Sequence, residues 1–180
     1  MSAIDTVLNF WFEEIKPSQW WEKDPEFDQI ISDRFKDIHE QARQCELFRW
    51  RETPLGRLAE IIVLDQFSRN IYRNDWRSFA SDPLALALAQ GAVRYGADEL
   101  LDQQHRNFLY LPYMHSESLK VHEQALTLYQ EKAEQGSLNS ENKHKVIIER
   151  FGRYPHRNKI LGRKSSHLEI EFLKEAGSSF

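Results

Sequence analysis

Three pairs of residues that end in proline punctuate the sequence and constrain it to a helical fold. Asp24-Pro25, Thr53-Pro54 and Asp82-Pro83 each place a short polar side chain directly before a proline. Such a side chain caps a free backbone N–H at a helix N-terminus, where the N–H that proline lacks has no helical partner. We therefore predict that a helix begins at each of these three positions.

Apolar residues recur at helical spacing along the rest of the chain, and no stretch shows the sustained period-two alternation of a strand. Ser166 and Glu169 form the pattern of a capping box for a last helix near 167–176. Further helices are expected near 3–12, 83–95, 97–110, 116–134 and 140–151, with glycines as stops at 96, 136, 152 and 177. The prediction is one all-α domain spanning 1–180, with about seven to nine antiparallel helices and no sheet.

Composition excludes several classes of protein. The net charge is −4, which argues against general affinity for nucleic acid. No apolar run approaches the ~20 residues of a membrane span, and the N-terminus has no signal-peptide pattern. Cys45 is the single cysteine, so no disulfide can form within the chain. We expect a soluble, cytoplasmic protein that binds neither membranes nor nucleic acid.

The helix that begins at Pro54 is apolar on nearly all sides, yet it carries Asp65 and Arg69, with Asn70 at its end. The spacing of four residues allows Asp65 and Arg69 to pair, and a buried charge is costly unless it is paired. One interpretation is a buried ion pair that fixes helix packing. The alternative is that Asp65 orients Arg69 toward an anionic ligand.

A basic run between 151 and 164 stands out in this acidic protein. Its candidate ligand-binding residues are Arg153, His156, Arg157, Asn158 and Arg163. A short helix over 158–161 would present free N–H groups to an anion, and arginine binds carboxylate or phosphate through its planar fork. The run is either such a ligand site or a basic surface turn.

His115 and Glu117 form a third candidate position, at the expected start of the 116–134 helix. His115 is either an acid or base held by Glu117 or by a neighbouring helix, or a satisfied core residue. His122 lies on the same predicted stripe, about 10 Å further along the axis, too far for both rings to bind one metal ion. We expect no metal and no cofactor, and the common catalytic motifs are absent.

These positions coincide with longer motifs that resemble the bacterial family called domain of unknown function 924. The motifs are VLNFWF at 7–12, LDQFSRN at 64–70, PYMHSE at 112–117, RFGRYPHRN at 150–158 and LGR at 161–163. The resemblance runs nearly end to end and implies a tetratricopeptide-like arrangement of helix pairs, but no activity. His122 departs from the polar, non-histidine residue expected at its position, so the resemblance gives it no role.

Three functional hypotheses follow. The first is one polar pocket that binds a small anionic metabolite, with Arg69, Arg157 and Arg163 on the anion and His115 or His156 moving a proton. The second is a concave helical surface that holds a peptide or a protein. The third is a buried charge network that serves only to fix the packing. The sequence assigns no catalytic reaction.

Overall fold

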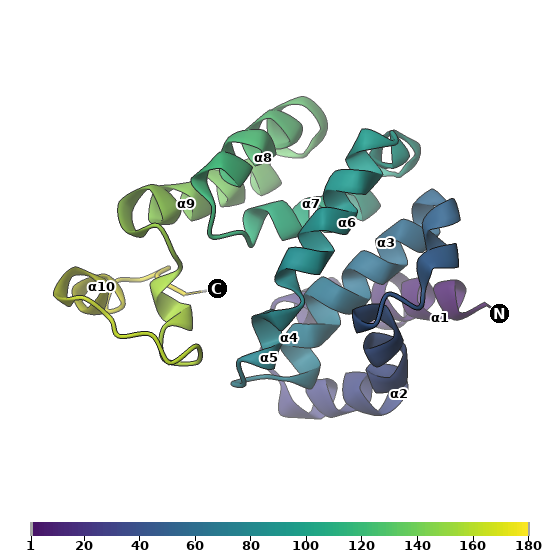
Figure 1. Ribbon diagram of the computed structural model, residues 1–180, viewed down its shortest axis with the longest axis horizontal. Helices are drawn as coiled ribbons and strands as arrows, with labels where there is room; N and C mark the ends of the chain where they lie inside the picture. Colours follow the sequence, from purple (N-terminus) through teal and green to yellow (C-terminus); the bar gives the residue numbers. More distant parts are fainter. Residues whose placement is uncertain (1, 180) are drawn as a thin grey trace.

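The computed structural model describes residues 2–179, and all the regular structure in this range is helical (Figure 1). The longer helices are α2 (Pro25–Arg43), α3 (Pro54–Ile62), α6 (Asp82–Arg94), α7 (Gln103–Met114), α8 (Leu119–Lys132) and α9 (Gln135–Phe151). The short ones are α1 (Ala3–Asn9), α4 (Ser68–Ile71), α5 (Arg77–Ala80) and α10 (His167–Phe172). The all-α prediction is confirmed, while the tetratricopeptide-like description stays a prediction.

Tighter and wider helical turns join these elements. The 3₁₀ turns are Pro17–Trp20, Phe48–Glu52, Ala97–Leu100 and Pro155–Arg157. Two π-helical turns, Phe10–Glu14 and Val63–Phe67, continue α1 and α3 without a break in the helical path. A π turn inserts one extra residue and therefore shifts which side chains share a face.

Two of the three predicted proline caps are confirmed. Asp24 accepts a hydrogen bond from the N–H of Glu26, and Thr53 accepts one from Gly56. The third is wrong, because Ser81 precedes α6 and Asp82 is the first residue of the helix. The Asp82 carboxylate is engaged instead by arginines from other elements, and that long-range contact overrides the local capping pattern.

Several helix boundaries in the structure also differ from the predicted ones. The expected 97–110 helix divides into the 3₁₀ turn Ala97–Leu100 and α7, because Asp102 caps a new start by accepting from the N–H of His105. The expected 116–134 helix begins only at Leu119, and His115 is the C-cap of α7 rather than part of α8. Helix α9 begins at Gln135 and runs through Gly136, and α10 ends at Phe172. The 158–161 helix is replaced by the 3₁₀ turn Pro155–Arg157 and the turns that follow it.

The main apolar core lies between α1, α2, α3, α6, α7 and α8. It is rich in aromatic rings, and Trp11, Phe35, Phe67, Tyr110 and Tyr129 are almost fully buried. A smaller core of Ile147, Ile148, Tyr154 and Phe172 joins α9 to α10. Aromatic rings supply large buried areas and so stabilise a fold of this size.

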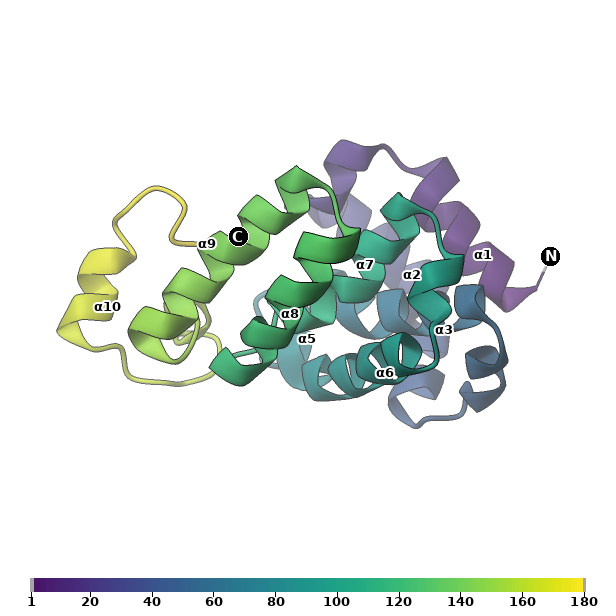
Figure 2. The same cartoon turned by 90° about the horizontal axis from the view of Figure 1, so that it is seen from above.

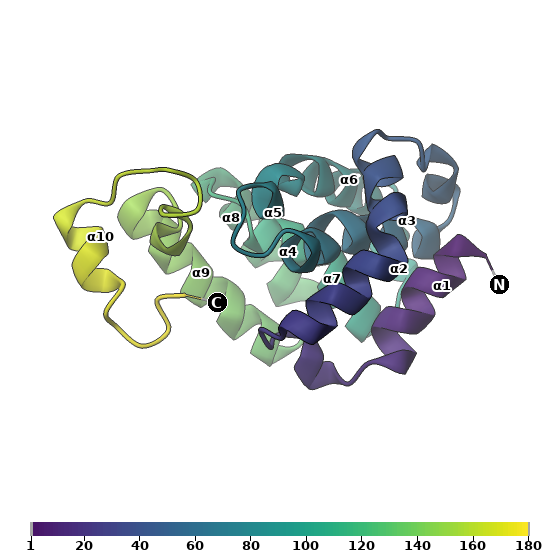
Figure 3. The same cartoon turned by 90° about the horizontal axis from the view of Figure 1, so that it is seen from below.

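The helices form an elongated molecule in which α1 and α10 lie at opposite ends (Figure 2, Figure 3). Helices α8 and α9 pack side by side, and α2 packs across the π turn Val63–Phe67 and α4. No helix in residues 2–179 is long and apolar enough to cross a membrane.

Candidate functional site

Asp65 lies in the π turn Val63–Phe67 and is almost completely buried. Its Oδ1 accepts a hydrogen bond from Nδ1 of His115 at 2.8 Å, and Oδ2 accepts one from Nε2 of Gln66 at 2.6 Å. Nη1 of Arg69 lies 3.3 Å from the same Oδ1 and also donates to the Asp65 carbonyl. Burial would raise the pKa of Asp65, but Arg69 and His115 outweigh it and hold that pKa below the usual range.

His115 reaches Asp65 because it follows the last residue of α7, a helix that carries Pro112 in its final turn. Burial lowers the pKa of His115, even though the charge of Asp65 opposes that shift. At neutral pH the ring is therefore uncharged, with its proton on Nδ1 facing the carboxylate. Nε2 makes no hydrogen bond to any residue in the described chain, and the side chain of His115 is 14% exposed.

Two arginines share one carboxylate beside this pair. Arg69 donates to both oxygens of Asp82 at 3.1 Å, and Nη1 of Arg157 lies 3.3 Å from Oδ2 of Asp82. Both guanidinium groups lie over the ring of Phe79, with the carbon of Arg69 at 5.8 Å and that of Arg157 at 4.5 Å. Arg157 also donates to the carbonyl of His115 at 3.1 Å, which joins this group to the histidine.

Arg157 is incompletely compensated for so buried a cation. Only 5% of its surface is exposed, and its single carboxylate contact among the described residues is to the oxygen that Arg69 also binds. Its Nε finds no hydrogen-bond acceptor within residues 2–179. Burial lowers the pKa of Arg157, although the nearby Asp82 acts in the opposite direction. A buried charge of this kind favours the approach of a further anion.

A second group of polar side chains fixes the loop that carries Arg157. Arg163 donates to both oxygens of Glu117 at 2.6 and 2.9 Å and to the Asn158 side chain at 2.9 Å. Glu117 also accepts the backbone N–H of Tyr154 at 2.7 Å. Burial raises the pKa of Glu117, but Arg163 reverses this and leaves it lowered. Glu117 thus holds the 154–163 loop and does not contact His115 through a hydrogen bond.

Three predicted site residues lie elsewhere or play another part. Asn70 binds Asp28, which also pairs with Arg73, on the side of α4 that faces α2. Arg153 binds both oxygens of Glu169 at 2.7 and 2.8 Å and so ties the loop to α10. Burial lowers the pKa of His156 to about 3, which leaves this ring neutral and poorly suited to carry a proton near pH 7.

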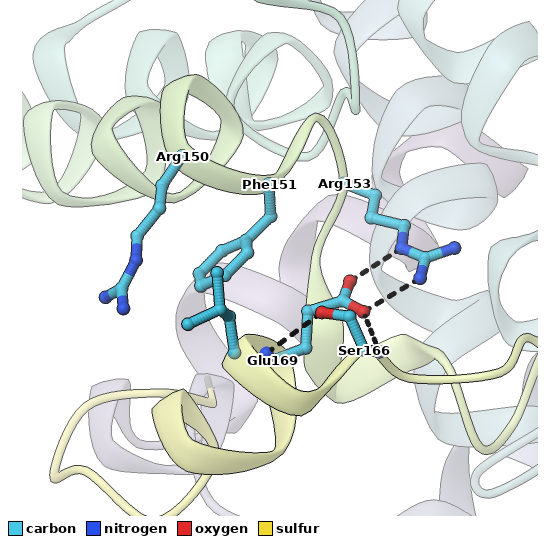
Figure 4. Close-up of a pocket in the computed structure, with 6 residues that line it drawn as sticks. Arg150, Phe151, Arg153, Ser166 and Glu169 are labelled. Carbon is cyan, nitrogen blue, oxygen red and sulfur yellow. Dashed lines mark hydrogen bonds and ion pairs between the residues drawn. The ribbon is translucent and has the colours of Figure 1, made fainter.

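Arg153 lines a surface hollow of about 410 Å³ between the end of α9 and the start of α10 (Figure 4). The other lining residues are Arg150, Phe151, Ser166, Leu168 and Glu169. Figure 4 shows Arg150 and Arg153 on opposite sides of the hollow, with Phe151 and Glu169 between them. This hollow is distinct from the Asp65–His115 group, none of whose residues lines it.

Sequence reasoning missed Asp82 and Phe79, which complete the arginine pair. The local sequence offered a capping role for Asp82, and only the fold brings it to Arg157, seventy-five residues away. The prediction that Asp65 orients Arg69 is incomplete, because Asp65 also orients His115. No signal within either segment links two residues that are fifty positions apart.

The arrangement offers no ready metal centre, since the described part of the chain has no group of three or more His, Cys, Asp and Glu side chains that could hold one. What it offers is a neutral imidazole held by a buried carboxylate, next to two arginines. An imidazole so held can accept a proton at Nε2, and arginines can bind carboxylate or phosphate oxygens.

Comparison with known proteins identifies relatives without an assigned activity. The pattern of the family described as "Bacterial protein of unknown function (DUF924)" matches residues 7–177. A solved structure, that of the protein of unknown function ATU0120 from Agrobacterium tumefaciens, is 38% identical with a TM-score of 0.90. The match covers 96% of this chain and 97% of that one. No curated protein matches the chain. The match over residues 7–177 shows that this chain belongs to the bacterial DUF924 family.

Proposed function

We propose that this protein binds a small anionic metabolite against Arg69 and Arg157, and that His115 serves there as a general base. The observation that carries the proposal is the open Nε2 of His115, whose Nδ1 is held by the buried Asp65. No other histidine–carboxylate pair in the described chain stands beside two arginines.

The state of the Asp65–His115 pair supports the role of a base. Asp65 is ionised and therefore accepts a hydrogen bond from Nδ1–H of His115, which leaves the lone pair of the neutral ring on Nε2. After Nε2 takes a proton from a hydroxyl or a water, the charge of Asp65 stabilises the imidazolium. The carboxylate also fixes the ring, so the acceptor atom is positioned before a ligand arrives.

Arg157 supports the binding of an anion in the same place. Its buried guanidinium shares one carboxylate with Arg69, and the rings of Phe79 and Tyr154 lie 4.5 and 4.8 Å from its central carbon. A ligand oxygen would add the charge-assisted hydrogen bonds that Arg157 lacks. The π turn that carries Asp65 is a further support, because such turns occur frequently at functional sites.

Thermal unfolding in the presence of inorganic phosphate, and separately of succinate, tests the binding step. Ligand at a hundred times its dissociation constant should stabilise the wild-type protein by about 2.7 kcal/mol. We expect Arg69→Gln to remove this stabilisation. Arg73→Gln is the matched control, because Arg73 also pairs with a part-buried aspartate but lies at Asp28.

Equal stabilisation of wild type and Arg69→Gln would contradict the proposed site. If neither anion stabilises wild type at any concentration tested, a closed structural network becomes the better account of these residues.

A second candidate function, peptide binding, is supported by the hollow at α9 and α10. Arg150 lies over the rings of Phe151 and Phe172 at 4.7 and 5.6 Å and makes no ion pair within the described residues. Leu168 is 64% exposed beside it. An acidic peptide with leucine side chains, followed by fluorescence anisotropy, should bind wild type and lose affinity in Arg150→Glu. Binding that is insensitive to this change would exclude the hollow.

A further inference from the structure

Asp82 occupies the position that an anionic ligand would take in the proposed site. We infer that the ligand carries a carboxylate or phosphate group that replaces the Asp82 carboxylate between Arg69 and Arg157. The ligand must then be negatively charged, because it takes over the role of Asp82 in neutralising the two arginines. The inference rests on the proposed function, since it assigns the ligand class of that same site.

The contacts of Asp82 are those of an occupant that can be displaced. Its two oxygens meet three guanidinium nitrogens at 3.1, 3.1 and 3.3 Å. Charge-assisted hydrogen bonds of this type are commonly shorter, about 2.7–2.9 Å. The side chain is 14% exposed, and it makes no capping bond to the backbone of α6. Asp82 thus neutralises both arginines without binding either at the best distance.

The arginines would keep their positions after Asp82 leaves. Arg69 stays anchored by the side chain and the carbonyl of Asp65. Arg157 stays anchored by the carbonyl of His115 and lies over the rings of Phe79 and Tyr154. Because these contacts do not involve Asp82, the binding groups are preorganised for a second anion.

Charge balance explains why the ligand must be anionic. Asp65 and Asp82 balance Arg69 and Arg157, and His115 is neutral. A neutral ligand that displaced Asp82 would leave a buried cation without compensation, which is costly. A ligand carboxylate restores the balance, and a phosphate adds acceptor oxygens that Nε of Arg157 can use.

Isothermal titration calorimetry of inorganic phosphate and of acetate separates the two ligand chemistries. We expect Asp82→Asn, which keeps the size of the side chain and removes its charge, to bind at least one of them about tenfold or more tightly than wild type. Asp82→Glu keeps the competing charge and should bind no more tightly than wild type. Asp28→Asn is the matched control, since Asp28 also neutralises an arginine but does so away from His115.

Unfolding in phosphate-free buffer provides a second measurement if Asp82→Asn is unstable. The loss of its charge should lower the unfolding temperature, and phosphate should restore more of that temperature than it adds to wild type. Unchanged or weaker binding by a folded Asp82→Asn protein would overturn the inference. The proposed function would survive that result if wild type still bound an anion in an Arg69-dependent way, and it would fail if neither protein bound one.

Discussion

The histidines of two histidine–carboxylate pairs, His115 and His122, lie close together in the chain, yet the pairs differ in whether the second ring nitrogen is free to bind a ligand. In the first, Nδ1 of His115 lies 2.8 Å from Asp65, and the histidine side chain is 14% exposed. In the second, Nδ1 of His122 lies 2.6 Å from Glu141, and both side chains are fully buried. Nε2 of His122 faces the Ser116 carbonyl at 2.8 Å and the Tyr154 hydroxyl at 3.2 Å, whereas Nε2 of His115 bonds to nothing in the described chain.

The difference teaches that a histidine–carboxylate pair is not by itself a candidate site. The carbonyl of Ser116 can only accept, so Nε2 of His122 carries a proton and has no lone pair to offer a ligand. Burial raises the pKa of Glu141, a shift that His122 opposes, and the pair holds α8 to α9 within a sealed interior. In the proposed function the first pair exchanges a proton with a ligand, whereas the second pair is structural.

The largest effect is expected from breaking the sealed pair. Glu141→Ala leaves the buried His122 without its carboxylate, and loss of one partner from a buried pair costs about 3–5 kcal/mol. Urea denaturation would measure the change in the free energy of unfolding. Glu141→Gln keeps a hydrogen-bonding group and should lose less. A loss below about 1 kcal/mol for Glu141→Ala would contradict the structural role.

A third buried histidine, His39, is hydrogen-bonded to the Ser68 hydroxyl rather than to a carboxylate, and it extends the comparison to the effect of pH. Burial, aided by Arg43, lowers the pKa of His39 from 6.5 to about 4. Since the unfolded chain binds this proton first, the stability contributed by neutral His39 is present above pH 6.5 and is lost as the pH falls toward 4. The loss amounts to ~3 kcal/mol at most. Denaturation at several pH values should show a smaller loss in His39→Gln, and an identical pH profile would refute this.

Asp65→Asn should have an intermediate effect. The variant removes the charge that compensates Arg69, and leaving a charged group less well bonded costs about 2 kcal/mol. An asparagine can also donate to Nδ1, which would favour the other tautomer and place the proton on Nε2. Denaturation measures the first effect and NMR of the ring nitrogens the second. No change in either would mean that Asp65 does not hold His115.

The smallest effect on stability is expected for His115→Asn. The side chain lies at the edge of the network, and the asparagine amide can replace Nδ1–H as donor to Asp65, so the cost should stay below ~1 kcal/mol. We expect the bound anion to remain, since the arginines are unchanged, while any proton transfer to the ligand stops. A loss of several kcal/mol would make His115 as structural as His122 and remove the contrast.

The sequence predicted what short-range patterns control. The caps at Asp24 and Thr53 and the capping box of Ser166 and Glu169 depend on neighbours three residues away or fewer, and they are confirmed. Gly152 stops α9 in the left-handed conformation that glycine adopts most readily. These local features are enough to predict the all-α class without any knowledge of tertiary contacts.

The candidate site was predicted only in part because it depends on long-range contacts. The apolar surroundings in the helix from Pro54 indicated that Asp65 is buried, but the pattern did not reveal the extra residue of the π turn Val63–Phe67. His115 was assigned to the wrong helix, and the capping signal of Asp82 was overridden by Arg69 and Arg157. Charged residues on apolar elements indicated which segments contribute to the candidate site, but not which side chains contact one another.

The most direct test of the account is NMR of the His115 ring nitrogens in wild-type protein during a titration with inorganic phosphate. We predict a neutral ring protonated on Nδ1 without phosphate, with a pKa below the usual 6.5. Phosphate should raise that pKa by about one unit, because a nearby negative charge favours the imidazolium. A ring protonated on Nε2, together with a pKa that phosphate leaves unchanged, would contradict the claim that His115 is the open base of an anion site.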